Sequence, residues 1–219
     1  MEIDKDKIKI AREIYNHLHK WNEANKAITE FFEEHPKNKD FKIVLIKVLL
    51  IDGLYKTSLK NPDAIEIARK IVNLPNLDED LTKDGLDACM SIADCKKDNK
   101  ENIFLMSFAS KYCHFNTNKK FPIFDKYVGL TLKISDTKRN KEILNKFFSR
   151  MKELSKKNKI NFEDLDIFLW LYGQKIYIKK QIKKGKILDK IDVNKEVRGL
   201  FTSKPDLFNA LDFCGAEEE

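Results

Sequence analysis

The chain has 219 residues and a formal net charge of +7 at pH 7, and 42% of its residues are hydrophobic. This composition argues against a disordered protein, because so many apolar side chains can bury a core. The longest apolar run, Ile43–Ile51, contains Lys47 and is too short to span a bilayer, so we expect no membrane segment. The charged N-terminus lacks the apolar stretch of a signal peptide, and we expect a cytoplasmic protein.

Glycine and proline are scarce, with 7 and 5 residues, whereas β-rich proteins need many turns built from them. Their scarcity predicts an all-α, multi-helix globular fold. We expect one helical domain at residues 1–185 and a C-terminal appendage of short helices with a frayed end at residues 186–219, because Gly185 interrupts the helical pattern.

In chain order, the helical spacing of apolar residues and the N-cap and proline signals predict the helices. They are Asp4–Trp21, Ala24–Phe32, Asp40–Leu59, Asn61–Leu74, Thr82–Cys95, Asn102–Phe115, Pro122–Lys133, Thr137–Leu154 and Asn161–Ile182. The helix after Asp40 is apolar nearly all round, which indicates a central, buried helix. Lys96–Lys100 is expected to be a polar loop, and Ser203–Asp206 to open a short helix in the tail.

The cysteines indicate neither a metal site nor a redox motif. Cys89, Cys95, Cys113 and Cys214 are scattered, and no two of them have CxxC spacing. We therefore expect no metal, no cofactor and mostly buried, reduced thiols.

The stretch Phe108–Val128 contains a Lys-His-Asp group with a definite local geometry. Lys111 and His114 are three residues apart and share a helix face. Pro122 is expected to start a new helix, with Asp125 in its first turn. Lys111 and Asp125 are then either a catalytic pair or a structural ion pair, and Asp125 has the further alternative of capping its own helix. His114 is either functional or a packed core residue.

Several lysines are candidates for phosphate binding. Lys119 and Lys120 lie in the turn between the two helices, and Lys126 follows Asp125, so they suit either a phosphate site or a solvated loop. The densest basic run, Lys179–Lys186, suits either a phosphate backbone or a solvated helix end. The net charge itself has two readings, a polyanionic partner or a lysine-rich composition bias.

The segments Ala109-Ser110 and Ile123-Phe124-Asp125 resemble the helix-hairpin-helix DNA glycosylase superfamily, and in particular its archaeal 8-oxoguanine DNA glycosylases. In those proteins a helix with the motif Lys-x-Ala-Ser precedes a loop and the motif Ala-Ile-(Leu/Ile)-Asp. The resemblance extends from Phe41 to Trp170. Ser107 stands at the position of the family's lysine, and Lys111 follows one helical turn later on the same face. The family's hairpin glycines have no counterpart in Lys100–Phe104.

The resemblance implies a glycosylase-like fold that binds DNA, with weak or lost base-excision activity. It makes Asp125 the residue that stabilises the oxocarbenium-like sugar or activates water, and Lys111 the substitute nucleophile or a phosphate contact. Ser107, Lys119, Lys120 and Lys126 are the nucleic-acid-binding candidates. The damaged base would have to be flipped out of the stack. The alternative is a non-enzymatic helical binding or scaffold protein in which Lys111 and Asp125 are structural.

Overall fold

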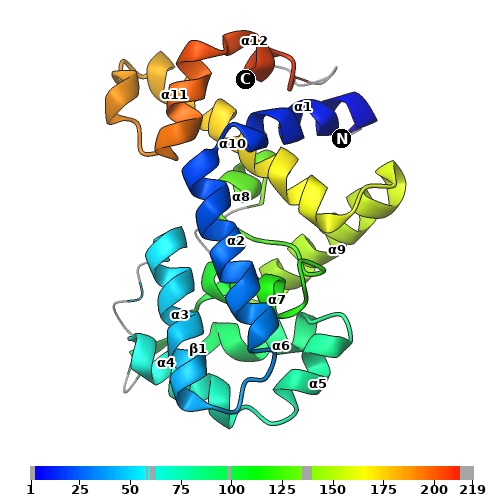
Figure 1. Cartoon of the computed structure of the whole chain (residues 1–219), viewed down its shortest axis with the longest axis vertical. Helices are drawn as coiled ribbons and strands as arrows, with labels where there is room; N and C mark the ends of the chain where they lie inside the picture. Colours follow the sequence, from blue (N-terminus) through cyan, green and yellow to red (C-terminus); the bar gives the residue numbers. More distant parts are fainter. Residues whose placement is uncertain (1–2, 58, 60–62, 98–99, 135–139, 213–219) are drawn as a thin grey trace. The chain divides into compact units, whose positions relative to one another are not determined.

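The computed structural model describes residues 3–57, 59, 63–97, 100–134 and 140–212, and it consists mainly of α-helices (Figure 1). The first helices are α1 (Lys5–Asn16), α2 (His19–Glu34), α3 (Phe41–Tyr55), α4 (Ala64–Asn73), α5 (Leu77–Thr82), α6 (Leu86–Ala93) and α7 (Met106–Asn116). They are followed by α8 (Lys126–Leu132), α9 (Lys141–Asn158), α10 (Phe162–Lys183), the short 3-10 helix η1 (Leu188–Lys190), α11 (Lys195–Ser203) and α12 (Pro205–Asn209). The prediction of an all-α, multi-helix fold is confirmed. The strands β1 (Asp94–Lys97) and β2 (Lys100–Phe104) add a short antiparallel hairpin.

The chain divides into two compact units, each assembled from segments that are distant in sequence. The first unit comprises the described residues of Met1–Glu23, Asp125–Asp136 and Lys152–Glu219, and the second those of Ala24–Phe124 and Thr137–Met151. Residues on both sides of Gly185 belong to the first unit, so this division differs from the boundary expected between residues 1–185 and 186–219.

Helix α10 forms the centre of the first unit, where it packs against α1 and α8. As expected, it begins after the N-cap Asn161 and continues past Gly173. Gly173 is required for the close approach of α8, because a Cβ atom there would lie 2.2 Å from the carbonyl oxygen of Tyr127. Trp170 of α10 stacks on Trp21, with ring centroids 5.3 Å apart.

Helix α7 forms the centre of the second unit, where it packs against α3 and α6. All of its residues from Met106 to Phe115 are buried except Ser107. The extended segment after α7 adds Phe121 and Phe124 to this core, where they pack against Phe148 and Phe147. This segment is therefore fixed by its aromatic side chains rather than by helical structure.

The prediction that α3 is a central, buried helix holds for only one of its sides. Val44, Val48 and Ile51 are buried, but Ile46 and Leu49 on the opposite side are 41% and 52% exposed. Apolar composition all around a helix predicted burial, whereas the second unit covers only one side of it. The helix also ends at Tyr55 rather than Leu59.

Two predicted helices are interrupted. The expected helix Asp4–Trp21 is divided between α1 and α2, and the carboxylate of Glu196 accepts hydrogen bonds from the backbone nitrogens of Lys20 and Trp21 at the start of α2. A partner so distant in sequence leaves no local signal. The expected helix Thr82–Cys95 begins only at Leu86, because Thr82 ends α5 and Gly85, whose φ is +73°, separates α5 from α6.

The helices on either side of the Phe108–Val128 stretch also begin later than predicted. Asn102–Phe104 belongs to β2, so α7 begins at Met106, and α8 begins at Lys126 rather than at Pro122. Asp63, rather than Asn61, is the N-cap of α4, with Glu66 completing a capping box. Residues 60–62 and the predicted cap Thr137 lie outside the described residues.

Candidate functional site

The ammonium group of Lys111 lies beside Ser107 on α7. Its Nζ is 2.7 Å from the Oγ of Ser107 and 3.1 Å from the Ser107 carbonyl oxygen, and it lies 5.4 Å from the ring centroid of Tyr55. The residue is only 2% exposed. The expectation that Lys111 and position 107 share a helix face is thus confirmed, because the one-turn spacing brings the amine to the side chain of Ser107.

A third acceptor of Lys111 is the carbonyl oxygen of Phe124, 3.3 Å from Nζ. Ser110 holds the same residue, because the backbone nitrogen of Phe124 donates to its Oγ at 3.0 Å. His114 holds the start of the segment, with its Nδ1 2.7 Å from the carbonyl oxygen of Phe121. Since a carbonyl only accepts, Nδ1 is the protonated nitrogen of this ring. Ser110, Lys111 and His114 therefore fix the extended segment that leads to Asp125.

His114 is 5% exposed and has its ring edge against Phe115, which is the packed environment that the core interpretation predicted. The amine of Lys111 donates to the carbonyl oxygens of Ser107 and Phe124, and a lysine needs a free lone pair on this nitrogen for nucleophilic attack. The resting arrangement of α7 thus suits a structural or ligand-contacting cation better than a nucleophile.

Asp125 is the N-cap of α8, immediately before the helix rather than in its first turn. Its Oδ1 accepts hydrogen bonds from the backbone nitrogens of Tyr127 and Val128, both at 2.8 Å. These bonds and the helix dipole stabilise the carboxylate as an anion. Lys111 belongs to the second unit and Asp125 to the first, and Phe124, which Lys111 contacts, directly precedes Asp125 in the chain.

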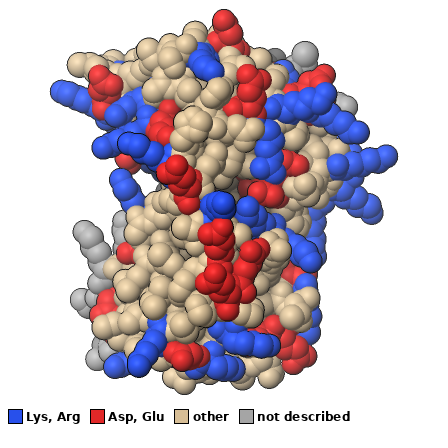
Figure 2. Space-filling view, viewed as in Figure 1, with Lys and Arg blue, Asp and Glu red and all other residues tan. Residues whose placement is uncertain are grey.

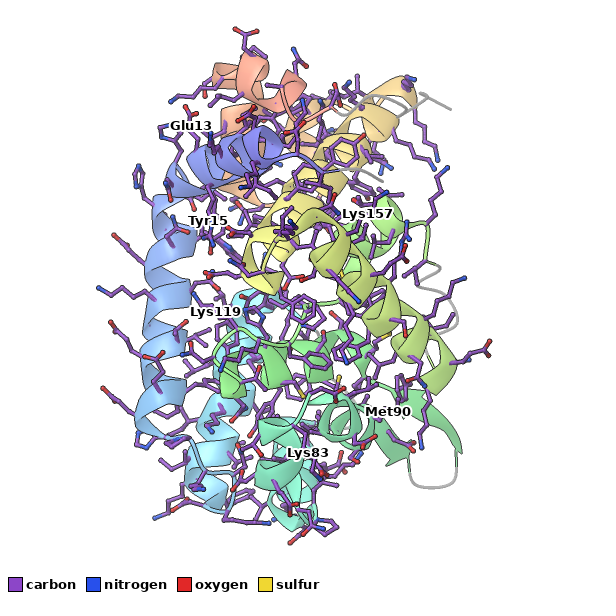
Figure 3. The ribbon with its side chains drawn as sticks, turned by 90° about the vertical axis from the view of Figure 1, so that its right-hand side faces the viewer. Glu13, Tyr15, Lys83, Met90, Lys119 and Lys157 are labelled. Carbon is purple, nitrogen blue, oxygen red and sulfur yellow. The ribbon has the colours of Figure 1, made fainter. Side chains whose placement is uncertain are left out.

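The other lysine candidates have different surroundings. Lys119 and Lys120 lie in the turn after α7, where Lys119 has a φ of 62° and its backbone nitrogen donates to the backbone carbonyl oxygen of His114 (Figure 3). Lys120 is exposed. Lys126 packs its ammonium over the rings of Tyr127 and Tyr177, at 4.8 and 4.9 Å from their centroids, and pairs with Asp192 at 3.3 Å. Lys126 is therefore already held by two aromatic partners and one acidic partner.

A family model named HI_0787_N and described as an N-terminal domain matches residues 7–120, just over half of the chain. The chain belongs to the HI_0787_N family. A protein of Haemophilus influenzae, described only as an uncharacterized protein, is 32% identical over 147 residues, which cover 63% of this chain and 70% of that relative. No solved structure matches the chain.

The HI_0787_N match contains Ser107, Lys111, Lys119 and Lys120 but ends before Asp125. It also contains a buried lysine that the sequence analysis did not single out. The side chain of Lys47 in α3 is fully buried, and its Nζ donates to the side-chain oxygens of Asn38 and Asn116, both at 3.0 Å.

The Lys47 network links three parts of the second unit. Asn38 also accepts a hydrogen bond from the Tyr112 hydroxyl at 2.6 Å and donates to Asp78 at 2.7 Å. Burial lowers the pKa of Lys47 to about 8, and the charge of Asp78 partly opposes this shift. The signal for this network was Lys47 itself, a single charge inside the longest apolar run, which we had used only to argue against a membrane segment.

Two features are absent from the part of the chain that the structure describes. None of the described helices has the length and apolar composition needed to cross a membrane. No three His, Cys, Asp or Glu side chains gather among these residues in a way that could hold a metal ion. Cys89 and Cys113 are buried free thiols, as expected, and burial raises the pKa of Cys113 well above its ordinary value. The side chain of Cys95 and all of Cys214 lie outside the described part.

Proposed function

We propose that the protein binds DNA with a helix-hairpin-helix glycosylase-like architecture, acts in the cytoplasm, and has weak or no base-excision activity. The observation that supports this proposal best is the position of the Lys111 amine, 2.7 Å from the Oγ of Ser107. In the proteins that this chain resembles, residue 107 would be the catalytic lysine. The amine of Lys111 thus reaches the side chain at that position from one helical turn away.

In this proposal Asp125 supplies negative charge near the reacting sugar. As the N-cap of α8, its carboxylate is held in a fixed orientation by the backbone nitrogens of Tyr127 and Val128. A fixed anion stabilises an oxocarbenium-like transition state, or orients a water molecule for attack. The base would have to be flipped out of the duplex to expose the glycosidic bond.

The chemistry of Lys111 is expected to be weak. To act as a nucleophile, its amine has to lose a proton and leave the carbonyl oxygens of Ser107 and Phe124. As a cation held in place, it is better suited to contact a phosphate or a base oxygen. We therefore expect the protein to bind DNA but to form little or no Schiff base with it.

The first experiment is a DNA-binding titration over a range of salt concentrations. We expect binding to weaken steeply as salt is added, because lysine–phosphate contacts release counterions. The second is borohydride trapping on abasic-site DNA with wild type and Lys111→Ala, together with base release from an 8-oxoguanine duplex. Absence of DNA binding at low salt would reject the proposal, whatever the outcome of trapping.

The charge of Asp125 can be tested apart from its capping role. Asp125→Asn retains the side-chain oxygen that accepts from the helix and removes only the charge. Asp40→Asn is the matched control, because the Oδ1 of Asp40 accepts from the backbone nitrogens of Lys42 and Ile43 at the start of α3 in the same way. If Asp125 has the proposed role, only Asp125→Asn lowers base release.

The second candidate is a non-enzymatic helical binding or scaffold protein. Two observations favour it: Lys111 donates hydrogen bonds to Ser107 and Phe124, and Asp125 caps α8. Each of these interactions stabilises the fold and explains its residue without any catalytic role. Under this alternative, Lys111→Met lowers the melting temperature and the wild-type protein binds no DNA.

A further inference from the structure

The C-terminal end of α10 and the turn after it carry a cluster of exposed lysines. We name this cluster the basic end of α10, and it consists of Lys180, Lys183, Lys184, Lys186 and Lys190. No side chain of these five lysines has a carboxylate partner among the described residues. Figure 2 has the same viewing direction as Figure 1. It shows Lys and Arg side chains that project outward over the turn that follows α10.

Two other surface lysines, by contrast, have carboxylate partners. Lys83 on the surface pairs with Asp80 at 3.0 Å and with Glu79 at 3.6 Å, and Lys9 pairs with Asp6 at 3.2 Å. The segment Lys179–Lys186 contains no acidic residue. Like charges at this density repel one another, and an anionic partner would relieve that repulsion.

The neighbouring carboxylates already have other partners. Asp212 accepts from Lys175 at 2.6 Å and lies 3.9 Å from Lys179, and Asp192 pairs with Lys126. Asp189 lies 4.0 Å from Arg198. Within the described residues, no carboxylate therefore compensates the positive charge of the basic end of α10.

We infer that the basic end of α10 is a contact surface for the phosphodiester backbone of DNA. This inference rests on the proposed function and assigns part of the binding to a place remote in sequence from Lys111. Lys180 and Lys183 are three residues apart on α10, so both side chains lie on one side of the helix and can face the same duplex. Lysines that contact only phosphates position a protein on DNA without reading its sequence.

A membrane surface is the competing partner, since Ile182 and Ile187 are 45% and 64% exposed within this cluster. A helix that lies on a bilayer needs a continuous apolar face. Here the two isoleucines are separated by lysines and by Gly185, whose φ of 79° ends the helix, so they form no such face. The charge of the lysines, rather than the apolar surface of the two isoleucines, therefore selects the partner, and the phosphate backbone of DNA has the opposite charge.

The test compares two triple variants with equal loss of charge. One is Lys183→Gln, Lys184→Gln and Lys186→Gln, and the other is Lys156→Gln, Lys157→Gln and Lys159→Gln at the end of α9, where all three lysines are exposed. Figure 3 labels Lys157 near the end of that helix. The control lysines belong to the same unit and flank a helix terminus in the same way.

Binding of a short labelled duplex is measured by fluorescence anisotropy, with circular dichroism to show that each variant is folded. We expect the α10 variant to bind about tenfold more weakly than the wild type at about 50 mM salt. The slope of log binding constant against log salt concentration should become less negative by about 2 to 3. The α9 variant should retain the wild-type slope.

Equal losses in both variants would overturn the inference, because net charge alone would then explain them. Unchanged binding of the α10 variant would also overturn it. In that case the proposed function would remain intact, because the wild type would still bind DNA. Absence of wild-type binding would reject both. A preference of the wild type for vesicles of phosphatidylglycerol over the duplex, abolished in the α10 variant, would assign the surface to a membrane instead.

Discussion

The Nζ of Lys47 donates a hydrogen bond to the side-chain oxygen of Asn116 at 3.0 Å, which ties the middle of α3 to the last residue of α7. The amine also lies 4.9 Å from the ring centroid of Phe32. A lysine that is fully buried in a helical core requires such partners, because an unpaired charge there would strongly destabilise the fold. Lys47 is thus a structural centre of the second unit.

Lys47→Met is expected to change how stability depends on pH. Burial lowers the pKa of Lys47 from its ordinary value of 10.5 to about 8, so between these values the unfolded chain binds more protons than the folded chain. The free energy of unfolding contributed by this residue therefore rises with pH across that window, by about 1 to 3 kcal/mol. Urea denaturation of both proteins near the two ends of the window measures the difference.

The control for Lys47→Met is Lys42→Met, which changes an exposed lysine of the same helix. This variant should keep the wild-type pH dependence. If Lys47→Met also kept it, the lysine would not titrate in the predicted range, and the assignment of its lowered pKa would be wrong.

Ser110→Ala is expected to destabilise the protein by about 1 to 3 kcal/mol. The Oγ of Ser110 is buried and accepts from the backbone nitrogen of Phe124, so its loss leaves a buried donor without that partner. Thermal unfolding followed by circular dichroism measures the effect. A change within experimental error would show that the extended segment before Asp125 does not depend on this hydrogen bond.

Asp125→Ala is expected to cost about 1 kcal/mol of stability, because two backbone nitrogens at the start of α8 lose their acceptor. Asp125→Asn should cost much less, since asparagine is also a favourable N-cap. Chemical denaturation of the two variants compares these values. Equal destabilisation would mean that the charge of Asp125, rather than its hydrogen-bonding geometry, stabilises the fold.

Gly173→Ala is expected to destabilise the first unit by about 1 to 3 kcal/mol or more. The new Cβ would lie 2.2 Å from the Tyr127 carbonyl oxygen and 2.8 Å from the Oγ1 of Thr131, so α8 would have to move away from α10. Trp21 and Trp170 both lie in this unit, so tryptophan fluorescence reports its unfolding in urea.

Gly199→Ala provides the opposite control in the same unit. A Cβ at this position of α11 meets nothing within 4 Å. Alanine should therefore stabilise the helix by up to about 1 kcal/mol, through its higher helix propensity. If both substitutions changed the stability in the same direction, the close approach of α8 to Gly173 would not be the cause of the destabilisation.

Helical periodicity predicted most of the helices, because the repeat of apolar residues is a property of each segment alone. Local cap residues were found for the same reason, as with Asp40 before α3 and Asn161 before α10. Several other predictions failed where a distant residue ends or starts a helix. Glu196 at the start of α2 and the hydrogen bonds of Ser110 and Lys111 to Phe124 are examples.

The candidate site was predicted in part. The spacing of Ser107 and Lys111 placed both on one face of α7, and the structure has their side chains 2.7 Å apart. The Lys47 network was missed, because Asn38, Asp78 and Asn116 are separated by tens of residues and carry no shared pattern. The packing of α3 against α7 brings Asn116 to the buried amine, and Asp78 joins the network through Asn38.

The sequence by itself determined that the chain is helical, which of its segments are amphipathic, and where its lysines are concentrated. These properties depend on residues within a few helical turns of one another. The tertiary structure alone decided that α7 holds the Phe121–Phe124 segment through Ser110, Lys111 and His114. Hydrogen bonds between distant segments form only when apolar burial has brought their backbones together, so no local pattern could have predicted them.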